Sequence, residues 1–355
     1  MPSLPRNRPR RPHLVAGLLG LAVLSACAPA VSRAAPGPPT TAYPAEAGPP
    51  VGVGADTLSV LPRGVVAFPL IRRLIQTARR RVDVEIYEFG RADLAADLVD
   101  AHRRGVAVTV ITDPSVTASE ATAEHLRAAG VGVAAYPVRR QMIDHVKLLV
   151  VDGGVAAVVG GINWGATSGP NHDFDALVRG PAAANLERVV LRDLATSGLP
   201  VGVPTETVDP AIVVATTLPD SGIRALALEL VDGARTTLDL ELFVLTDAGV
   251  VHALARAHTR GVRVRLLLDP DQRPSDASAE LLRTAGVSVR LYRGWGEKLH
   301  AKAAVADGRR VLFGSANWTA GGFARNHELD IGFDSAPAAT TLLAAMRADW
   351  ESSAP

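Results

Sequence analysis

Residues 145–161 read HVKLLVVDGGVAAVVGG, and residues 300–315 read HAKAAVADGRRVLFGS. Each stretch contains two short apolar runs joined by a turn that begins with Asp-Gly, a pattern that predicts a β-hairpin. A histidine and a lysine stand two positions apart where the first run begins, so their side chains share one face of the predicted strand. An aspartate follows the lysine by five positions in both copies, which therefore have the form H-x-K-x-x-x-x-D.

The two hairpins belong to a longer internal repeat. A shift of 156 residues aligns residues 83–87 (DVEIY) with residues 239–243 (DLELF), and residues 101–106 (AHRRGV) with residues 257–262 (AHTRGV). Units of about 140 residues are too long for the repeats of a solenoid and indicate a duplicated domain.

The sequence of the first repeat unit predicts strands that alternate with helices. Strand-like runs at residues 82–87, 106–112 and 131–136 alternate with amphipathic stretches at residues 91–104 and 119–129. This order predicts a fold of the α/β class.

Polar groups suited to phosphate follow each hairpin. A small-residue turn with an asparagine lies at residues 160–163 (GGIN) and 314–317 (GSAN), and an Asn-His-acid segment lies at residues 171–173 and 326–328. The chain has three lysines among its 37 basic residues, and two of them occupy the repeated motif. Ammonium, imidazole and amide groups can donate to the non-bridging oxygens of a phosphate. Two such sets, brought together by the duplication, would surround a single phosphodiester.

These motifs resemble the signature of the phospholipase D superfamily, H-x-K-x(4)-D followed by a G-[GS]-x-x-N-like turn, present twice in one chain. The resemblance covers about residues 60–350. It implies an α/β fold of two pseudo-twofold-related α/β/α lobes with mixed β-sheets, and an active site between the lobes. We expect the first lobe at residues 58–205 and the second at residues 206–355.

The resemblance also implies a mechanism in which one histidine attacks phosphorus to form a phosphohistidine, while the other protonates the leaving alcohol and later activates water. By the family's usual division of labour, His145 is the nucleophile and His300 the acid, although the repeat alone does not distinguish them. No metal or other cofactor is required. Matching residues are Lys147, Lys302, Asn163 and Asn317 for binding the phosphoryl oxygens, with Gly161 and Ser315 in the same turns, and Asp173 and Glu328 for orienting the catalytic histidines.

The sequence leaves two interpretations open for several other repeated pairs. The histidines beside the orienting acids either line the site or serve the structure. The tryptophans after the motif asparagines either cap the core or border the substrate. The strand carboxylates form either a polar strand face or the back of the active site, or else a carboxylate pair or a metal site. These pairs are His172 and His327, Trp164 and Trp318, and Asp83/Glu85 with Asp239/Glu241. Asp152 and Asp307, by contrast, are expected to hold the hairpin loops rather than to touch substrate.

The first 27 residues have the form of an export signal. Four arginines precede the apolar run of residues 14–26, which is too short to span a bilayer. The run ends in Leu24-Ser25-Ala26-Cys27, which resembles the lipobox of bacterial lipoproteins, and Cys27 is the only cysteine of the chain. Residues 28–57 are rich in Pro, Ala and Gly, as expected of a tether. We therefore expect a protein that is lipid-anchored at Cys27 to the outer face of a bacterial membrane, or secreted.

Net charge bears on the choice of substrate. The whole chain has a formal charge of +1; residues 1–26 hold four arginines and no acid, so the remainder has 33 basic and 36 acidic residues, a formal charge of −3. This leaves no basic field for a nucleic acid, and aromatic residues for base stacking make up 4% of the chain. We expect a monomeric phospholipase D-like phosphodiesterase that hydrolyses phospholipids and can also transfer the phosphatidyl group to alcohols. A nuclease and a cardiolipin synthase-type phosphatidyltransferase are the alternatives.

The lipobox predicts the effect of a Cys27→Ala substitution. Because the lipid would be attached through the thiol, the variant should leave the membrane fraction or remain unprocessed, which fractionation and mass spectrometry of the N-terminus would detect. Turnover of a soluble substrate should not change. Equal membrane retention of the variant would show that another part of the protein anchors it.

Overall fold

The computed structural model describes residues 47–204, 210–218, 222–294 and 297–353. The predicted signal, Cys27 and most of the predicted tether lie outside the described residues. Among the helices of the described part, none has both the length and the apolar composition needed to cross a membrane.

The described chain alternates strands and helices in two successive halves. The first half comprises β1 (Val51–Val53), β2 (Asp56–Pro62), α1 (Gly64–Thr77), β3 (Arg81–Ile86), α2 (Ala92–Arg103), β4 (Ala107–Thr112), α3 (Thr117–Ala128), β5 (Gly132–Ala135), β6 (Lys147–Val151), β7 (Ala156–Gly160), β8 (Phe174–Arg179) and α4 (Pro181–Thr196). The second comprises β9 (Ile212–Thr216), α5 (Gly222–Asp232), β10 (Thr237–Leu242), α6 (Ala248–Thr259), β11 (Arg263–Leu268), the short 3-10 helix η1 (Arg273–Ser275), α7 (Asp276–Thr284), β12 (Ser288–Leu291), β13 (Lys302–Ala306), β14 (Arg310–Gly314), α8 (Ala320–Ala324), β15 (Leu329–Asp334) and α9 (Ala336–Ser352).

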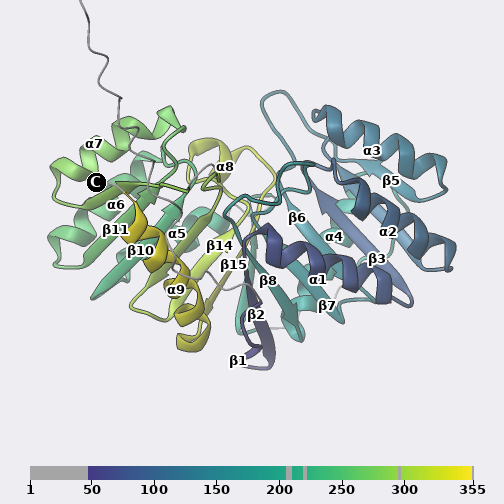
Figure 1. Cartoon of the computed structure of the whole chain (residues 1–355), viewed down its shortest axis with the longest axis horizontal. Coiled ribbons are helices and arrows are strands. Elements are labelled where there is room, and N and C mark those ends of the chain that lie inside the picture. The colour runs from purple at the N-terminus through teal and green to yellow at the C-terminus, as the bar shows by residue number, and fades with distance from the viewer. Residues whose placement is uncertain (1–46, 205–209, 219–221, 295–296, 354–355) are drawn as a thin grey trace, which may run out of the picture. The chain divides into compact units, whose positions relative to one another are not determined.

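Each half forms its own mixed sheet, and the two sheets have the same topology (Figure 1). Within the described residues the first sheet has the strand order β1-β2-β8-β7-β6-β3-β4-β5, and the second has the order β9-β15-β14-β13-β10-β11-β12. In the first, β3, β4 and β5 are parallel, whereas β6, β7 and β8 pair antiparallel with their neighbours. The second sheet repeats these directions strand for strand. The predicted α/β fold of two duplicated lobes with mixed sheets is confirmed.

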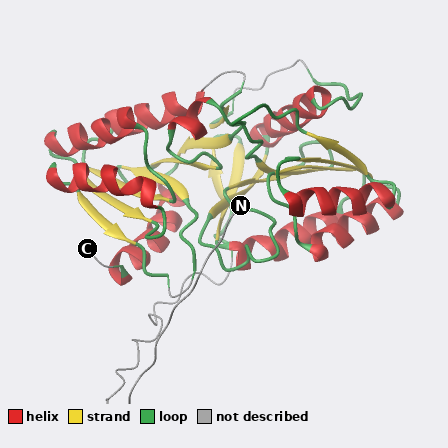
Figure 2. Ribbon diagram, turned by 90° about the horizontal axis from the view of Figure 1, so that it is seen from above, coloured by secondary structure: helices red, strands yellow, loops and turns green. Residues whose placement is uncertain are grey.

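Both faces of each sheet are covered, and Figure 2 shows the strands between layers of helices. Side chains of a strand point alternately to the two faces. On β6, Leu149 and Val151 face the core formed with α1 and α2, whereas Leu148 and Val150 face a second core on the side of α4. The motif strands therefore consist almost wholly of apolar residues because both of their faces are buried.

The second of these cores is shared by the two lobes. It joins residues of β6, β7 and α4 to residues of β13, β14 and α9, while α1–α3 and α5–α7 cover separate cores on the outer faces of their own sheets. The two halves therefore pack as one hydrophobic unit, which fixes how their motif strands face each other.

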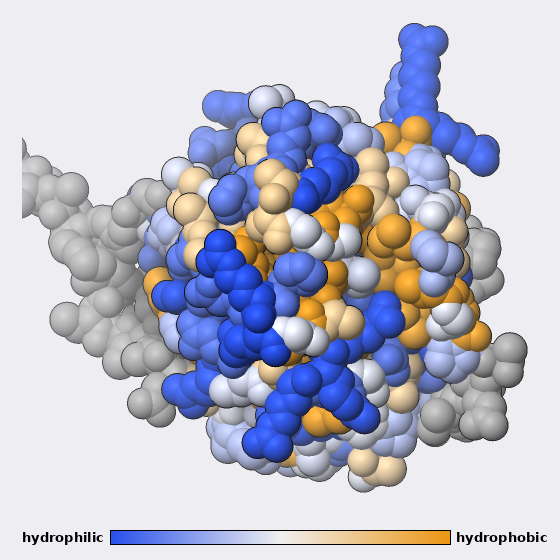
Figure 3. All heavy atoms as spheres, turned by 90° about the vertical axis from the view of Figure 1, so that its right-hand side faces the viewer, coloured by the Kyte–Doolittle hydropathy of each residue, from blue (hydrophilic) through white to orange (hydrophobic). Residues whose placement is uncertain are grey.

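The outer helices are amphipathic. α3 buries Ser119, Ala123 and Leu126 along one side and exposes charged residues on the other. Figure 3 views the molecule from this end, where hydrophilic side chains are interspersed with smaller hydrophobic areas. This pattern is typical of solvent-facing helices that cover a sheet.

The start of the first sheet differs from the sequence prediction. β1 and the first two residues of β2 lie within the stretch predicted as tether, residues 28–57. β1 pairs antiparallel with β2, with Val51 opposite Leu58, and the side chain of Val53 is buried. Its three residues are too few to give a recognisable alternation, and the surrounding prolines and glycines favoured a tether interpretation.

The hairpin aspartates hold the loops that precede strands β3 and β10. Asp152 and Asp307 have positive φ angles of 54° and 53°, a left-handed conformation that aspartate tolerates better than most residues. The carboxylate of Asp307 accepts hydrogen bonds from the backbone N–H groups of Arg235, Thr236 and Thr237 at 2.8–3.1 Å. Asp152 accepts the corresponding bonds from residues 79–81. Each carboxylate thereby ties the hairpin turn to the start of the first parallel strand.

An Asp307→Ala substitution should destabilise the folded protein in a pH-dependent way. Partial burial opposes ionisation of Asp307, but the backbone N–H donors outweigh it and lower its pKa to about 2 from a usual 3.8. The stabilisation is therefore present above about pH 4 and is lost as the pH falls through about 2. In urea unfolding at pH 7, Asp307→Ala should lose about 2 kcal/mol.

The control is Asp100→Ala, which removes an exposed carboxylate paired with Arg103 and should change the free energy of unfolding by less than about 0.5 kcal/mol. If Asp307→Ala cost as much at pH 2 as at pH 7, the charged hydrogen bonds would not be the cause.

Candidate active site

At the motif histidines, a short backbone segment of each lobe hydrogen-bonds with a segment of the other lobe. We call this arrangement the exchange. The backbone N–H of His145 donates to the carbonyl of His327 at 2.8 Å, and the N–H of His327 donates to that of Ile143 at 2.8 Å. The N–H of His300 donates to the carbonyl of His172 at 2.8 Å, and the N–H of His172 donates to Lys298 at 2.9 Å. Each Asn-His-acid segment therefore pairs with the segment that leads into the motif strand of the opposite lobe.

This exchange pairs each motif histidine with an acid of the other lobe. Nδ1 of His145 lies 2.8 Å from Oε2 of Glu328, and Nδ1 of His300 lies 3.0 Å from Oδ2 of Asp173. All four side chains are buried, and the two rings retain only 5% and 6% exposure. The sequence predicts that these acids orient catalytic histidines but does not say which acid serves which ring. The tertiary structure makes the assignment crosswise.

Burial keeps both imidazoles neutral. It lowers the pKa of His300 to about 4 and also lowers that of His145, and the orienting acids only partly offset this effect. A neutral ring whose Nδ1–H donates to a carboxylate has its lone pair on Nε2. We assign this tautomer from the hydrogen bonds, and it leaves Nε2 as the nucleophilic or basic atom of each ring.

The two motif lysines are buried beside these rings. Burial lowers the pKa of Lys147 to about 7 and that of Lys302 to about 8. Nζ of Lys302 lies 2.8 Å from Nδ1 and 3.1 Å from Nε2 of His300. The charge of Lys302 also lowers the pKa of His145 in the opposite half-site, and that of Lys147 lowers the pKa of His300. The two half-sites therefore form one electrostatic site.

The half-sites differ in how they hold the orienting acid, and here the structure changes two predicted roles. Ser315, expected beside the phosphate, donates its hydroxyl to Oε2 of Glu328 at 2.7 Å, so it supports that acid. A side chain at Gly161 would place its Cβ 2.4 Å from Oδ1 of Asp173, so Gly161 makes room for the other acid. Glu328, the longer acid, is therefore supported by the hydroxyl of Ser315, whereas Asp173, the shorter acid, lies against Gly161.

The motif asparagines and tryptophans have separate environments. Oδ1 of Asn163 and Oδ1 of Asn317 are buried, and neither has a hydrogen-bond partner within the described ranges. A phosphate would take its hydrogen bonds from the Nδ2–H groups of these amides. Trp164 and Trp318 are 2% and 0% exposed and pack in the outer cores, so the core interpretation is correct for both.

Two aromatic residues that were not predicted from the sequence lie beside the rings. Tyr87 and Phe243 place their ring centroids 4.8 Å from those of His145 and His300, respectively. Their rings also face the ammonium groups of Lys147 and Lys302 at 5.1 and 5.4 Å. The sequence feature that could have identified them is that positions 87 and 243 correspond at the 156-residue shift.

Two buried aspartates, also not predicted from the sequence, stand two positions after the orienting acids. Asp330 accepts the N–H of Ala316 at 3.0 Å, and Asp175 accepts that of Ile162 at 3.3 Å. Burial raises the pKa of Asp330 to about 8 and raises that of Asp175 well above its usual value. These groups hold the asparagine turns.

Two buried groups place enough ligand atoms together to raise the question of a metal ion. Glu85, Asp193 and His327 form one, and His172, Glu241 and Asp349 form the other, each with ligand atoms within 4.8 Å of one another. A metal-bound histidine usually donates its second ring N–H to an acceptor, but Nδ1 of both rings lacks a hydrogen-bond partner in the described part of the chain. Nε2 of His327 lies 2.9 Å from the nearest carboxylate oxygen, a hydrogen-bond distance. We therefore interpret both groups as hydrogen-bonded ion clusters.

A family model described as "Cardiolipin synthase, PLD-like domain" matches residues 71–193 and again residues 227–350. The chain belongs to the phospholipase D superfamily. Both matched segments contain one H-x-K-x-x-x-x-D motif, one asparagine turn and one orienting acid.

The similar proteins include one named as a synthase and one named as a hydrolase. The chain is 29% identical over 323 residues to a protein named cardiolipin synthase from Geobacillus kaustophilus (strain HTA426), which covers 79% of this chain and 63% of the relative. It is 40% identical over 110 residues to one named mitochondrial cardiolipin hydrolase from Xenopus laevis, which covers 31% of this chain and 51% of the relative. The chain thus spans about half to two thirds of these relatives.

The fold is also found in a solved structure. The crystal structure of phosphatidylserine synthase from Haemophilus influenzae Rd KW20 superposes with a TM-score of 0.63 and 14% identity, over 85% of this chain and 87% of that one. This likeness covers both lobes and supports the fold alone.

Sulfate binding should depend on pH through the buried lysines. Sulfate keeps its charge from pH 6 to 9, and the rings stay neutral there because their pKa values are lowered. Since the ammonium of Lys147 loses its proton around pH 7 and that of Lys302 around pH 8, calorimetry should find affinity falling as the pH rises through this range.

Lys147→Met should weaken sulfate binding at pH 6 by about 10- to 100-fold, the worth of a charge-assisted hydrogen bond. Arg103→Met is the control, because the side chain of Arg103 is 72% exposed on α2 and its substitution also removes one positive charge. Equal binding by both variants, without a pH trend, would contradict a phosphate-binding role for Lys147.

Proposed function

We propose that this protein hydrolyses phospholipid phosphodiesters through a phosphohistidine intermediate, with His145 as nucleophile and His300 as general acid and base. The observation that carries the proposal is the pair of neutral rings, each held at Nδ1 by a carboxylate of the opposite lobe, with two ammonium groups acting on both. Such a site suits in-line substitution at an anionic phosphorus.

In the first step, Nε2 of His145 attacks phosphorus as the bond to the leaving alcohol breaks. His300 donates a proton to the departing oxygen, which yields a free alcohol and a phosphatidyl group bonded to His145. Burial lowers the pKa of His300 to about 4 in the empty site. An anionic phosphodiester would offset the charge of the lysines and so favour the protonated ring that this step needs.

In the second step, neutral His300 accepts a proton from water, and the water oxygen displaces His145 from phosphorus. The products are phosphatidic acid and regenerated His145. Lys147, Lys302, Asn163 and Asn317 would bind the non-bridging oxygens and stabilise the charge that develops in both transition states. The buried aspartates would keep the asparagine turns in place.

Several observations support a lipid substrate. The chain beyond residue 26 has a formal charge of −3, which does not suit a polyanion. A cavity of about 410 Å³ next to the exchanged segment 326–328 has Arg139, Arg140 and Arg325 among its lining residues, together with apolar residues such as Met142 and Leu218. Positive and apolar groups together suit a phosphate attached to an acyl chain. Relatives named for cardiolipin synthesis and hydrolysis point in the same direction.

Transfer to an alcohol is the second candidate reaction. The relative named cardiolipin synthase matches 79% of this chain, across both motifs, whereas the one named cardiolipin hydrolase matches 31%. In transfer, His300 would take the proton from an alcohol instead of water, and every other group would keep its role. A lipid anchor at Cys27 would hold the enzyme at the surface where both kinds of substrate reside.

The test combines a substrate panel with trapping of the intermediate. Purified protein is assayed in EDTA against phosphatidylcholine, phosphatidylglycerol, cardiolipin and single-stranded DNA, with and without added glycerol. We expect phosphatidic acid from one or more lipids and no activity in His145→Asn. The His300→Asn variant should retain activity mainly toward a p-nitrophenyl phosphodiester, whose leaving group needs little protonation. Acid quench of this variant should find the added mass on the peptide that contains His145.

The outcomes separate the alternatives. Release of nucleotides from DNA without release from lipids would identify a nuclease, and phosphatidylglycerol formation that outruns phosphatidic acid in glycerol would identify a transferase. Label on His300 in the His145→Asn variant would reverse the two roles. Full activity of both variants without label would exclude this mechanism.

A further inference from the structure

Two histidines outside the proposed chemistry occupy equivalent buried positions. His172 and His327 are both 0% exposed, and each immediately precedes an orienting acid, Asp173 or Glu328. Each also provides both backbone groups of the exchange between the lobes. The mechanism uses neither ring, so their burial needs a separate explanation.

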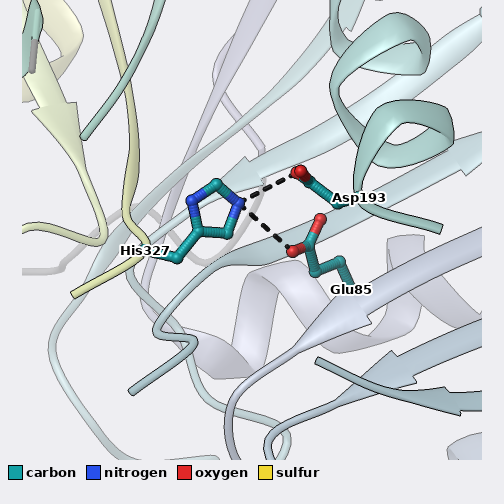
Figure 4. Close-up of side chains that lie close together, drawn as sticks. All are labelled: Glu85, Asp193 and His327. Carbon is teal, nitrogen blue, oxygen red and sulfur yellow. Dashed lines mark hydrogen bonds and ion pairs between the residues drawn. The ribbon is translucent and has the colours of Figure 1, made fainter. Parts of the chain in front are cut away.

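The ring of His327 reaches into the first lobe (Figure 4). Its Nε2 lies 2.9 Å from Oδ2 of Asp193 on α4 and 3.5 Å from Oε1 of Glu85 on β3. The ring also stacks on Tyr136, with centroids 4.7 Å apart and an interplanar angle of 7°. A residue of the second lobe is therefore fixed by a helix, a strand and an aromatic side chain of the first.

The ring of His172 makes the reciprocal contacts in the second lobe. Its Nε2 lies 2.8 Å from Oε2 of Glu241 on β10 and 3.1 Å from Oδ2 of Asp349 on α9. The ring stacks on Tyr292 at 5.7 Å and 14°. These partners are the 156-residue equivalents of those around His327. The duplication has thus kept both clusters.

The clusters can hold their histidines strongly. Burial alone lowers the pKa of His172, but the charges of Asp349 and Glu241 outweigh it and raise that pKa to about 10. Burial likewise opposes protonation of His327, and its hydrogen bond with Asp193 raises that pKa. An imidazolium beside buried acids is costly to displace, because moving it would remove a charge-assisted hydrogen bond from a buried carboxylate, although Arg192 would stay paired with Asp193 and Arg63 would stay near Asp349.

Adjacent residues in an extended segment point in opposite directions. At 326–328, His327 therefore points into the ion cluster while Glu328 points to His145. At 171–173, His172 points into the second cluster while Asp173 points to His300. Because each histidine is adjacent to an orienting acid, fixing the side chain of His327 also fixes the backbone position and direction from which the side chain of Glu328 extends. The same holds for His172 and Asp173.

We propose that His327 and His172 are positioning residues, each of which sets one orienting acid and through it one catalytic histidine: His327 acts on His145 through Glu328, and His172 acts on His300 through Asp173. This inference rests on the proposed function for its kinetic test but not for its spectroscopic one. Its distinctive consequence is that the two buried histidines, though equivalent in structure, serve different steps.

The kinetic test compares His327→Leu with His172→Leu. Misplacing a reacting group by about 1 Å costs about 10²-fold in rate. We expect His327→Leu to slow phosphohistidine formation by about this factor for good and poor leaving groups alike, with little change in KM. His172→Leu should slow the first step with alkyl phosphodiesters by a similar factor but spare the initial burst of p-nitrophenolate from a p-nitrophenyl diester, which needs little protonation. The second step, in which His300 is the base, should slow with both kinds of substrate.

Conservative and control variants separate positioning from stability. His327→Gln and His172→Gln place an amide donor near the position of Nε2 and should restore rates to within about fivefold of wild type. His252→Leu, at an exposed position of α6, should leave all rates unchanged. Thermal unfolding of each variant identifies losses caused by unfolded protein. The same kinetic signature in both Leu variants, or no rescue by Gln, would overturn the proposal.

The spectroscopic test needs no substrate. The Nδ1 protons of His145 and His300, each bonded to a carboxylate, should give separate downfield signals in the NMR spectrum of the free protein, assigned with His145→Asn and His300→Asn. His327→Leu should shift or remove the His145 signal and leave the His300 signal in place, and His172→Leu should do the reverse. Unchanged signals in both variants would overturn the positioning role, even if the proposed reaction were confirmed. If the two NMR signals change as expected but the protein is inactive on every substrate, the positioning role stands and only the proposed function is overturned.

Discussion

The active site depends on the exchange of two short backbone segments between the lobes. Residues 171–173 pair with residues 298–300, and residues 326–328 pair with residues 143–145. Because of this exchange, the acid that orients each motif histidine comes from the opposite lobe. Neither half contains a complete histidine–acid pair, so the site exists only when the lobes are packed together. The shared core between α4 and α9 maintains that packing.

Burial is the second constraint, and it acts differently on different groups. The motif rings and lysines have lowered pKa values because the charged forms lose water, whereas His172 and His327 have raised pKa values because buried carboxylates surround them. The same fold thus keeps two histidines neutral and favours the charged form of two others, each 27 positions after a motif histidine. Burial alone would lower the pKa of all four. Each motif ring has one orienting carboxylate, whose effect two lysines oppose, whereas two acids raise the pKa of His172 and of His327.

The duplication has preserved the frame and changed details at the orienting acids. Strand order, hairpin aspartates and ion clusters correspond in both lobes. Glu328 is supported by the hydroxyl of Ser315, whereas Asp173 occupies the space beside Gly161. Ser315 is larger than Gly161 and stands beside the longer acid. The extra methylene of Glu328 places its carboxylate farther from its own backbone than that of Asp173. The two half-sites are therefore not identical in chemistry.

The sequence by itself determined the duplication, the α/β class, the motif hairpins and the identity of the paired histidines, lysines, asparagines and acids. These follow from period-two hydrophobicity, turn residues and a repeat that can be read by alignment. It did not reveal the crosswise pairing of Glu328 with His145 and Asp173 with His300. Nor did it separate the neutral rings from His172 and His327, or give Ser315 its contact with the acid. Those depend on which segments meet and on which charges are buried together, and only the tertiary structure decides this, because residues more than 120 positions apart form each contact.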